Sequence, residues 1–242
     1  MHEYAVGLEE RTESAQLPEH SAPASTATRV ASVILKPAAR GWIHAVMTPL
    51  VLAQFMALVV LAPTAPLRAS CMVFGLCSLL LFGNSAVYHL GHWTRHVHSI
   101  LRRIDHSNIF LLIAGTYTPL AAALLSGGAR LTVLLVIWIG AAAGMVQSIF
   151  FVQAPRWVYV PLYILLGWVA VWFLPEFSRT GGAAVLWLII AGGIAYTIGA
   201  VAYAFKKPNP WPRVWGFHEF FHLGTALGYI CHSVAIWLAI FA

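Results

Sequence analysis

The sequence predicts an all-α integral membrane protein, a bundle of seven transmembrane helices with a cytoplasmic N-terminus and an outside C-terminus. Of its 242 residues, 60% are hydrophobic and only 9% are charged, and the mean hydropathy is +0.78. A helical membrane bundle needs so much apolar surface, whereas a soluble domain does not. The apolar residues also gather into seven stretches long enough to cross a bilayer, at roughly 43–62, 69–90, 106–125, 131–152, 157–174, 183–204 and 216–241.

The segment before the first span is different in composition. Residues 1–38 are polar and contain five of the eight acidic residues, so we expect a disordered polar tail there and the seven-helix domain over 39–242. The tail lacks the basic start and apolar run of a cleavable signal peptide, so we expect the first span to direct insertion.

Basic residues near the membrane predict the orientation. With the N-terminus inside, the inside segments contain ten of them: Arg29, Lys36, Arg40, Arg95, Arg102, Arg103, Arg156, Lys206, Lys207 and Arg213. The outside segments contain three: Arg68, Arg130 and Arg179. This asymmetry follows the positive-inside rule. The net charge of +6 therefore reflects orientation in the lipid bilayer, and no nucleic-acid partner is expected because the basic residues form no single patch.

Few side chains inside the spans carry polar chemistry. Cys71, Cys77 and Cys231 have no metal-ligand spacing, and we expect them to pack without a disulfide. We assign Glu176 to an outside loop. The last span contains more polar side chains, because it begins with His218-Glu219-Phe220-Phe221-His222. Histidines four apart share a helix face, about 6 Å along the axis, so both can bind one metal ion.

Two further sites fall at the same predicted depth. His89, with Ser85 one turn earlier, ends the second span, and Asp105 opens the third. All lie in the cytoplasmic leaflet with His218 and His222. Ionisable residues at membrane depth usually mark a function. We therefore predict a zinc site made by His89, His218 and His222, with water in the fourth position and Asp105 orienting or deprotonating that water.

Each of these residues also has a simpler interpretation. His89 suits the membrane interface, Asp105 suits a helix cap or a pair with Arg102, and Ser85 suits a bond to a backbone carbonyl. Glu219 suits either the general base of a zinc protease or a contact with a neighbouring helix or the interface. No acidic residue follows Glu219 to serve as the third ligand of such a protease.

A polar stripe continues along the last span. Positions 218, 222, 225, 229 and 232 are His, His, Thr, Tyr and His, within about 80° of arc, so the stripe faces the bundle interior or a wet cavity. His232 lies about 15 Å beyond His222 along the helix. It cannot join the same metal site, and we expect it to line a cavity or bond another helix.

These motifs resemble those of the haemolysin III family, which belongs to the progestin and adiponectin receptor superfamily and is similar to alkaline ceramidases. The resemblance covers about 36–242 and is carried by Ser85-x-x-x-His89, Asp105, His218-x-x-x-His222, Arg40–His44, Leu81–His89, Asp105–Pro119 and Pro210-Trp211-Pro212. It implies seven helices with the N-terminus inside and one zinc held by His89, His218 and His222. It also implies that Asp105 contacts the zinc-bound water, with Ser85 close by.

The activity has several candidates. The first is a zinc hydrolase acting on amide or ester bonds of a lipid that enters from the membrane, with Asp105 as the base and Ser85 helping the oxyanion. The second is a non-enzymatic membrane-homeostasis regulator or receptor-like protein with structural zinc. A lytic, haemolysin-type protein ranks third. A zinc transporter lacks carboxylates along its path, and a retinal pump lacks a lysine within a span.

Overall fold

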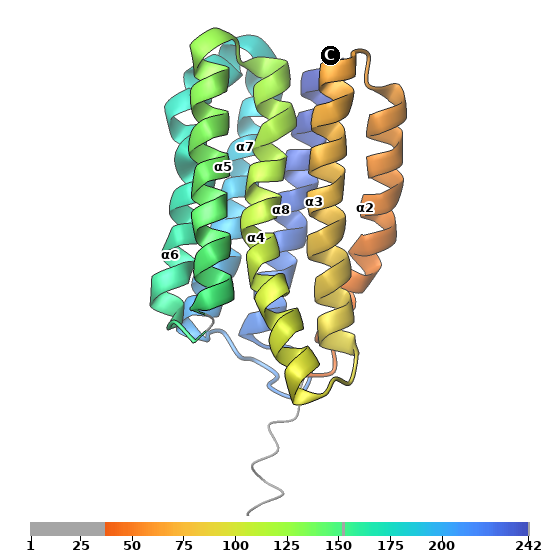
Figure 1. Ribbon diagram of the computed structural model, residues 1–242, viewed down its shortest axis with the longest axis vertical. Helices are drawn as coiled ribbons and strands as arrows, with labels where there is room; N and C mark the ends of the chain where they lie inside the picture. The colour runs from red at the N-terminus through yellow and green to blue at the C-terminus, as the bar shows by residue number, and fades with distance from the viewer. Residues whose placement is uncertain (1–36, 152, 242) are drawn as a thin grey trace, which may run out of the picture. The chain divides into compact units, whose positions relative to one another are not determined.

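The computed structural model describes residues 37–151 and 153–241, and the predicted all-α fold is confirmed there (Figure 1). The regular elements of this part are helices, apart from one isolated bridge between Trp211 and Trp215. In chain order they are α2 (Trp42–Leu61), α3 (Ala65–Leu90), α4 (Arg95–Leu124), α5 (Gly127–Phe150), α6 (Arg156–Gly167), the 3₁₀ helix η1 (Trp168–Phe173), α7 (Leu174–Phe205) and α8 (Phe217–Phe241). The predicted tail falls almost wholly outside the described residues.

Six described helical stretches are long and apolar enough to cross a membrane, where the sequence predicted seven spans. One of the six is 50 residues long, from Arg156 to Phe205, and joins α6, η1 and α7. A crossing needs only about 20 residues. The stretch folds back on itself, because Arg156 Nη1 donates a hydrogen bond to the carbonyl oxygen of Tyr203 at 2.8 Å. Its backbone is non-helical at Gly182, with φ 78° and ψ 177°.

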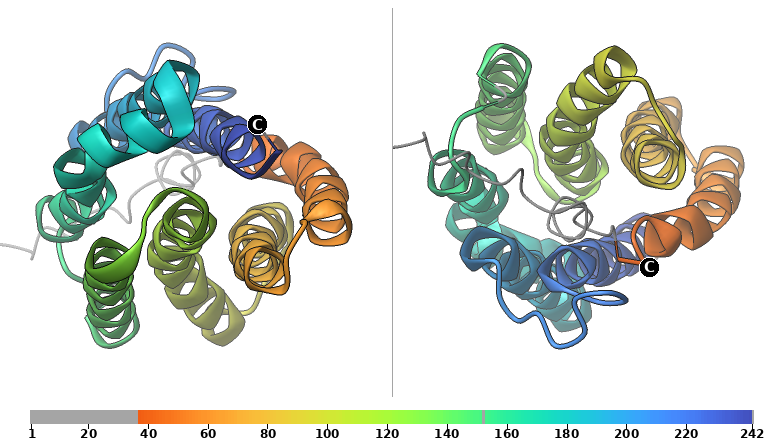
Figure 2. Two further views of the ribbon diagram at one scale, coloured as in Figure 1. Left: turned by 90° about the horizontal axis from the view of Figure 1, so that it is seen from above. Right: turned by 90° about the horizontal axis from the view of Figure 1, so that it is seen from below.

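The helices follow one another around the bundle axis, and α8 closes the ring beside α7 and α2 (Figure 2). The contact of α8 with α7 is the closest, because small residues let the two backbones meet. A Cβ atom at Gly224 would lie 2.7 Å from the Ala195 carbonyl oxygen and 2.9 Å from the Gly199 Cα atom. α8 also contacts α2, α3 and α4, so its polar stripe lies in the interior of the bundle.

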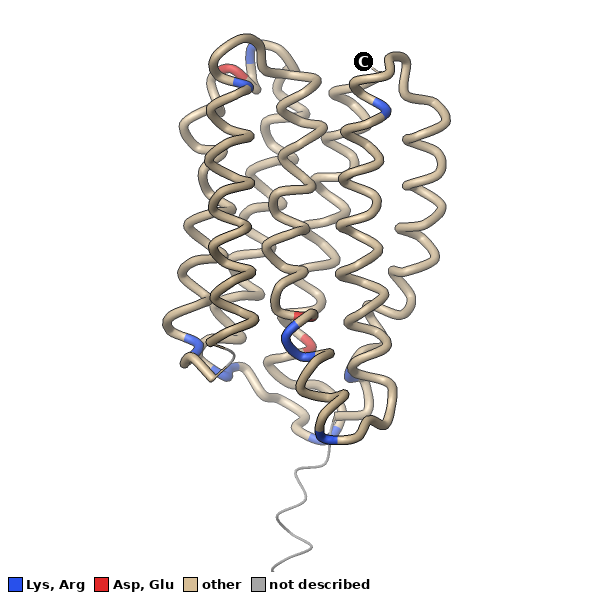
Figure 3. Tube along the Cα trace, viewed as in Figure 1, with Lys and Arg blue, Asp and Glu red and all other residues tan. Residues whose placement is uncertain are grey.

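The outer surface is apolar, as a bilayer requires. Trp157, Trp172 and Phe205 are each at least 74% exposed, and many other large apolar side chains cover the outside. A soluble protein rarely exposes so much contiguous apolar surface. The basic residues instead concentrate toward one end of the bundle (Figure 3). The protein is therefore a multi-pass membrane protein.

Two element assignments differ from the sequence-based expectation. α4 begins at Arg95 instead of 106, because Thr94 caps it by accepting a hydrogen bond from the Val97 backbone N–H. Glu176, expected in a loop, lies in the first turn of α7. The expectation for the cysteines is confirmed, since Cys71, Cys77 and Cys231 are all free thiols.

Candidate metal centre

Two helices bring three histidines together. His89 lies in the last turn of α3, and His218 and His222 lie in the first turns of α8. One ring nitrogen from each forms a group whose members all lie within 4.8 Å of one another. His222 is 2% exposed and His89 is 6% exposed, so the group is enclosed by the bundle. The three histidines could hold a metal ion.

The spacing of two of these nitrogens supports that interpretation. His89 Nε2 and His218 Nε2 are 3.3 Å apart. Two imidazole nitrogens bound to one tetrahedral ion, each about 2.05 Å from it, would be about 3.3 Å apart. Hydrogen bonds from N–H groups are usually shorter, at about 2.7–3.2 Å. The pair therefore has the separation that a shared metal ion requires.

Asp105 and Ser85 lie beside this cluster. Asp105 Oδ2 is 3.8 Å from His89 Nε2, and the Ser85 hydroxyl donates a hydrogen bond to the Asp105 carboxylate. The helix-cap interpretation of Asp105 is wrong, because Thr94 caps α4 and Asp105 lies inside that helix, and among the described residues Asp105 forms no ion pair with Arg102. The five residues singled out in the sequence are thus adjacent in space.

Glu219 points elsewhere. Its Oε1 atom pairs with the Arg40 guanidinium, and its Oε2 atom accepts a hydrogen bond from the Gly216 backbone N–H at 2.8 Å. Both carboxylate oxygens are therefore occupied at the start of α8, where a negative charge also suits the helix dipole. Glu219 therefore does not face the histidine cluster, and the zinc-protease interpretation is wrong. In place of the expected contact with a neighbouring helix, Glu219 contacts Arg40 in the segment that precedes α2.

Sequence reasoning missed the role of a fourth histidine, His44 on α2. Its ring is 3% exposed and stacks on the His222 ring, with centroids 3.9 Å apart and planes 8° from parallel. Its other neighbour is Phe82, whose ring it meets edge-on at 5.0 Å. The available signal was a lone histidine inside an otherwise apolar span.

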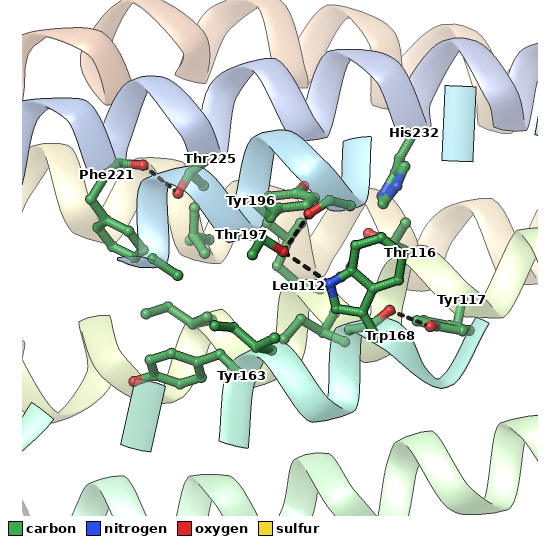
Figure 4. Close-up of a pocket in the computed structure, with 17 residues that line it drawn as sticks. Leu112, Thr116, Tyr117, Tyr163, Trp168, Tyr196, Thr197, Phe221, Thr225 and His232 are labelled. Atoms are coloured by element: carbon green, nitrogen blue, oxygen red, sulfur yellow. Dashed lines mark hydrogen bonds between the residues drawn. The ribbon is translucent and has the colours of Figure 1, made fainter. Parts of the chain in front are cut away.

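A cavity lies between the helices, and Figure 4 shows the residues that line it. It has a volume of about 70 Å³ and is lined mainly by apolar side chains of α3, α4, α6, α7 and α8. Four of its lining residues also line the small pocket that contains Ser85, Asp105 and His222, namely Leu81, Ile109, Phe221 and Thr225. The candidate metal centre and the cavity are therefore neighbours.

His232 lies at another part of this cavity, as the sequence predicted. Its Nε2 atom is 3.1 Å from the carbonyl oxygen of Ile189 on α7, so it both lines the cavity and bonds another helix. Nearby, Trp168 Nε1 donates to the Thr197 hydroxyl at 2.9 Å (Figure 4). His232 is not among the three clustered histidines.

The apolar exterior, the membrane-length helices and the buried histidine cluster define a multi-pass helical membrane protein with a possible metal centre. Residues 32–233 match the family described as Haemolysin-III related. The chain is 35% identical over 161 residues to the Hemolysin-3 homolog of Bacillus subtilis (strain 168), which covers 66% of this chain and 73% of that protein. The chain belongs to the haemolysin-III-related family.

Two other relatives extend the comparison. Hemolysin-3 of Bacillus cereus is 34% identical over 169 residues, which cover 69% of this chain and 75% of that protein. The human Monocyte to macrophage differentiation factor is 26% identical over 167 residues, which cover 67% of this chain and 66% of that protein. The family match includes every residue of the candidate metal centre.

Proposed function

We propose that this protein binds one zinc ion through His89, His218 and His222 and hydrolyses amide or ester bonds of membrane lipids. The donor set supports zinc, because three imidazoles with one open position are typical of catalytic zinc sites. The burial of the cluster and the 3.3 Å separation of two of its nitrogens fit the same ion. Zinc bound there would act as a Lewis acid and lower the pKa of coordinated water to about 7.

The observation that carries the hydrolase proposal is the position of Asp105. Its carboxylate is 3.8 Å from His89 Nε2, close enough to act beside the three-histidine cluster. A carboxylate there can accept a proton from the attacking water and return it to the leaving group. Ser85 holds this carboxylate in place through its hydroxyl. For Ser85 to stabilise an oxyanion instead, its hydroxyl must leave Asp105.

The cavity supports a lipid substrate. Its lining is mostly apolar, as an acyl chain requires, and its volume of about 70 Å³ is smaller than the roughly 300–1,000 Å³ of typical ligand pockets, so the helices must separate to admit a chain. It adjoins the pocket that holds Asp105 and His222. An acyl chain in the cavity would therefore place its polar end near Asp105, within the leaflet from which the lipid enters.

The membrane topology that we propose has seven crossings, with the N-terminus inside. The return of the chain between Arg156 and Tyr203 supports two crossings for that 50-residue stretch. The concentration of basic residues at one end supports the orientation, because cytoplasmic segments are enriched in lysine and arginine (Figure 3).

A second candidate is a regulator or receptor-like protein in which the zinc is structural. The small pocket beside Asp105 and His222 favours it, because its volume is only about 10 Å³. The lytic alternative, suggested by the name of the Bacillus cereus relative, has less support. The polar stripe of α8 is buried at His222, Thr225 and Tyr229, so it offers no exposed amphipathic face.

The deciding experiment compares zinc content per chain in the purified parent, His89→Ala and His222→Ala, with His232→Ala as a matched control. We expect about one zinc in the parent and the control, and loss from both site variants. The zinc-loaded parent is then screened against lipid amides and esters, with Asp105→Asn alongside. Full zinc in both site variants, or none in the parent, would overturn the zinc proposal. Bound zinc without any turnover would favour the structural role.

A further inference from the structure

The segment that starts α2 touches both helices that carry the clustered histidines. We call Arg40–His44 the α2 turn. Arg40 pairs with Glu219, the neighbour of His218, at the start of α8. Gly41 packs on the end of α3, where an added Cβ atom would lie 2.8 Å from the His89 Cβ atom. His44 stacks on His222 at 3.9 Å. The α2 turn therefore contacts His89 and His222 directly, and it contacts the neighbour of His218, Glu219.

The location of these contacts matters for the site. His89 belongs to α3, whereas His218 and His222 belong to α8, so the geometry of the cluster depends on how these two helices are held together. α2 packs along α3 and also contacts α8. The two residues just before the α2 turn are bonded to the segment before α8, because Ala38 N–H donates to the Arg213 carbonyl at 2.9 Å and Ala39 N–H donates to the Val214 carbonyl at 3.2 Å.

His44 has the geometry of a support and lacks that of a ligand. An ion bound by an imidazole nitrogen lies in the plane of that ring, along the nitrogen lone pair. Because the His44 and His222 rings are stacked with planes 8° from parallel, an ion in the His222 plane lies outside the His44 plane. The Phe82 and His44 rings meet edge-on with their centroids 5.0 Å apart, and this contact limits rotation of the His44 ring.

We propose that the α2 turn positions the three-histidine cluster for metal binding, with His44 as a positioning residue that fixes the His222 ring by stacking. This inference rests on the proposed metal site. Residues that orient metal ligands commonly change metal affinity by about 10–100-fold when they are replaced. The stacking surface of His44, and not its nitrogens, carries the effect, so phenylalanine should replace it.

The test measures zinc affinity by chelator competition in the full-length protein, purified in detergent. The variants are His44→Ala, His44→Phe and His232→Ala, where the last removes a partly buried imidazole from the same helix as His222. We expect His44→Ala to bind zinc about 10–100-fold more weakly than the parent. His44→Phe and His232→Ala should keep affinities close to the parent value. Thermal unfolding of the zinc-free forms and size-exclusion profiles verify that each variant is folded.

The outcomes separate this inference from the proposed function. A parent that binds no zinc overturns both. A parent that binds zinc, with unchanged affinity in folded His44→Ala, overturns the positioning role alone. Equal loss in His44→Ala and His44→Phe also overturns it, because the effect then belongs to the nitrogens. If His44→Ala does not fold, the comparison of His44→Phe with the parent decides: parent-like affinity supports stacking, and a 10-fold or larger loss contradicts it.

Discussion

Arg40, two residues before α2, forms an ion pair with Glu219 in the first turn of α8, 179 positions later in the chain. The Glu219 side chain is 1% exposed and the Arg40 side chain is 18% exposed. A buried carboxylate is costly unless it is paired and hydrogen-bonded, and here Gly216 supplies the second bond. The pair links the α2 turn to α8, the helix that carries His218 and His222.

Replacing Arg40 should therefore destabilise the protein strongly. Arg40→Ala leaves the Glu219 carboxylate buried without its counter-charge, and we expect a loss of about 3–5 kcal/mol in the free energy of unfolding. Denaturant unfolding in detergent micelles measures this loss. Arg103→Ala is the control, since Arg103 is exposed and should change stability by no more than about 0.5 kcal/mol. Equal stability of the two variants would show that the ion pair contributes little.

Zinc should stabilise the folded protein through the histidine cluster. A ligand that binds only the folded state at about 100 times its Kd adds about 2.7 kcal/mol. We therefore expect the Tm to rise with added zinc and to fall after treatment with a chelator. The same scans on His89→Ala should show neither shift. A zinc-dependent Tm in His89→Ala would place the binding site elsewhere.

The variant Asp105→Asn should keep zinc binding and lose lipid hydrolysis. The amide keeps the size of the side chain but cannot accept the proton, so we expect hydrolysis to fall by about a hundred- to ten-thousand-fold. Zinc content should stay at the parent value, because the three histidines are unchanged. Rates on a lipid amide together with metal analysis provide the measurement. Full activity in Asp105→Asn would exclude Asp105 as the base.

Gly192 on α7 should tolerate no side chain while His232 is present. A Cβ atom there would lie 2.4 Å from both Cδ2 and Nε2 of His232. Gly192→Ala should therefore displace His232 from the Ile189 carbonyl and cost about 1–3 kcal/mol of stability. Gly193→Ala is a matched control, because its nearest contact would be an ordinary 3.5 Å from Trp168.

A double mutant tests the cause of that loss. If the steric contact is responsible, Gly192→Ala should cost much less in a His232→Ala background, with a coupling energy of about 0.5–3 kcal/mol. Additive losses would indicate that Gly192 is needed for close packing of α7 on other parts of α8.

Much of the helical fold could be predicted from the sequence because apolar runs of membrane length are a local property. The runs that became α2, α3, α5 and α8 correspond to single helices. The stretch from Arg156 to Phe205 was harder, because an apolar run does not signal its 3₁₀ segment or the non-helical backbone at Gly182. The start of α4 was also missed, since Thr94 extends that helix into a polar segment without an apolar signal.

The residues of the candidate site were predictable for a similar reason. The four-residue spacing of His218 and His222 is set within one helix, and the depths of His89 and Asp105 follow from their positions at the ends of their spans. The structure brings them together with Ser85. The stacking of His44 on His222 was not predictable, because a single histidine in an apolar helix forms no spacing pattern with other polar residues.

The sequence by itself determined the apolar helices and the ionisable residues placed at membrane depth, and it predicted the orientation of the helices in the bilayer. These follow from the composition and spacing of residues close together in the chain. Only the tertiary structure decided that Glu219 faces Arg40 and that His44 stacks on His222. Such pairs are set by which helices become neighbours and how each is rotated, and neither property is encoded in the local pattern of either helix.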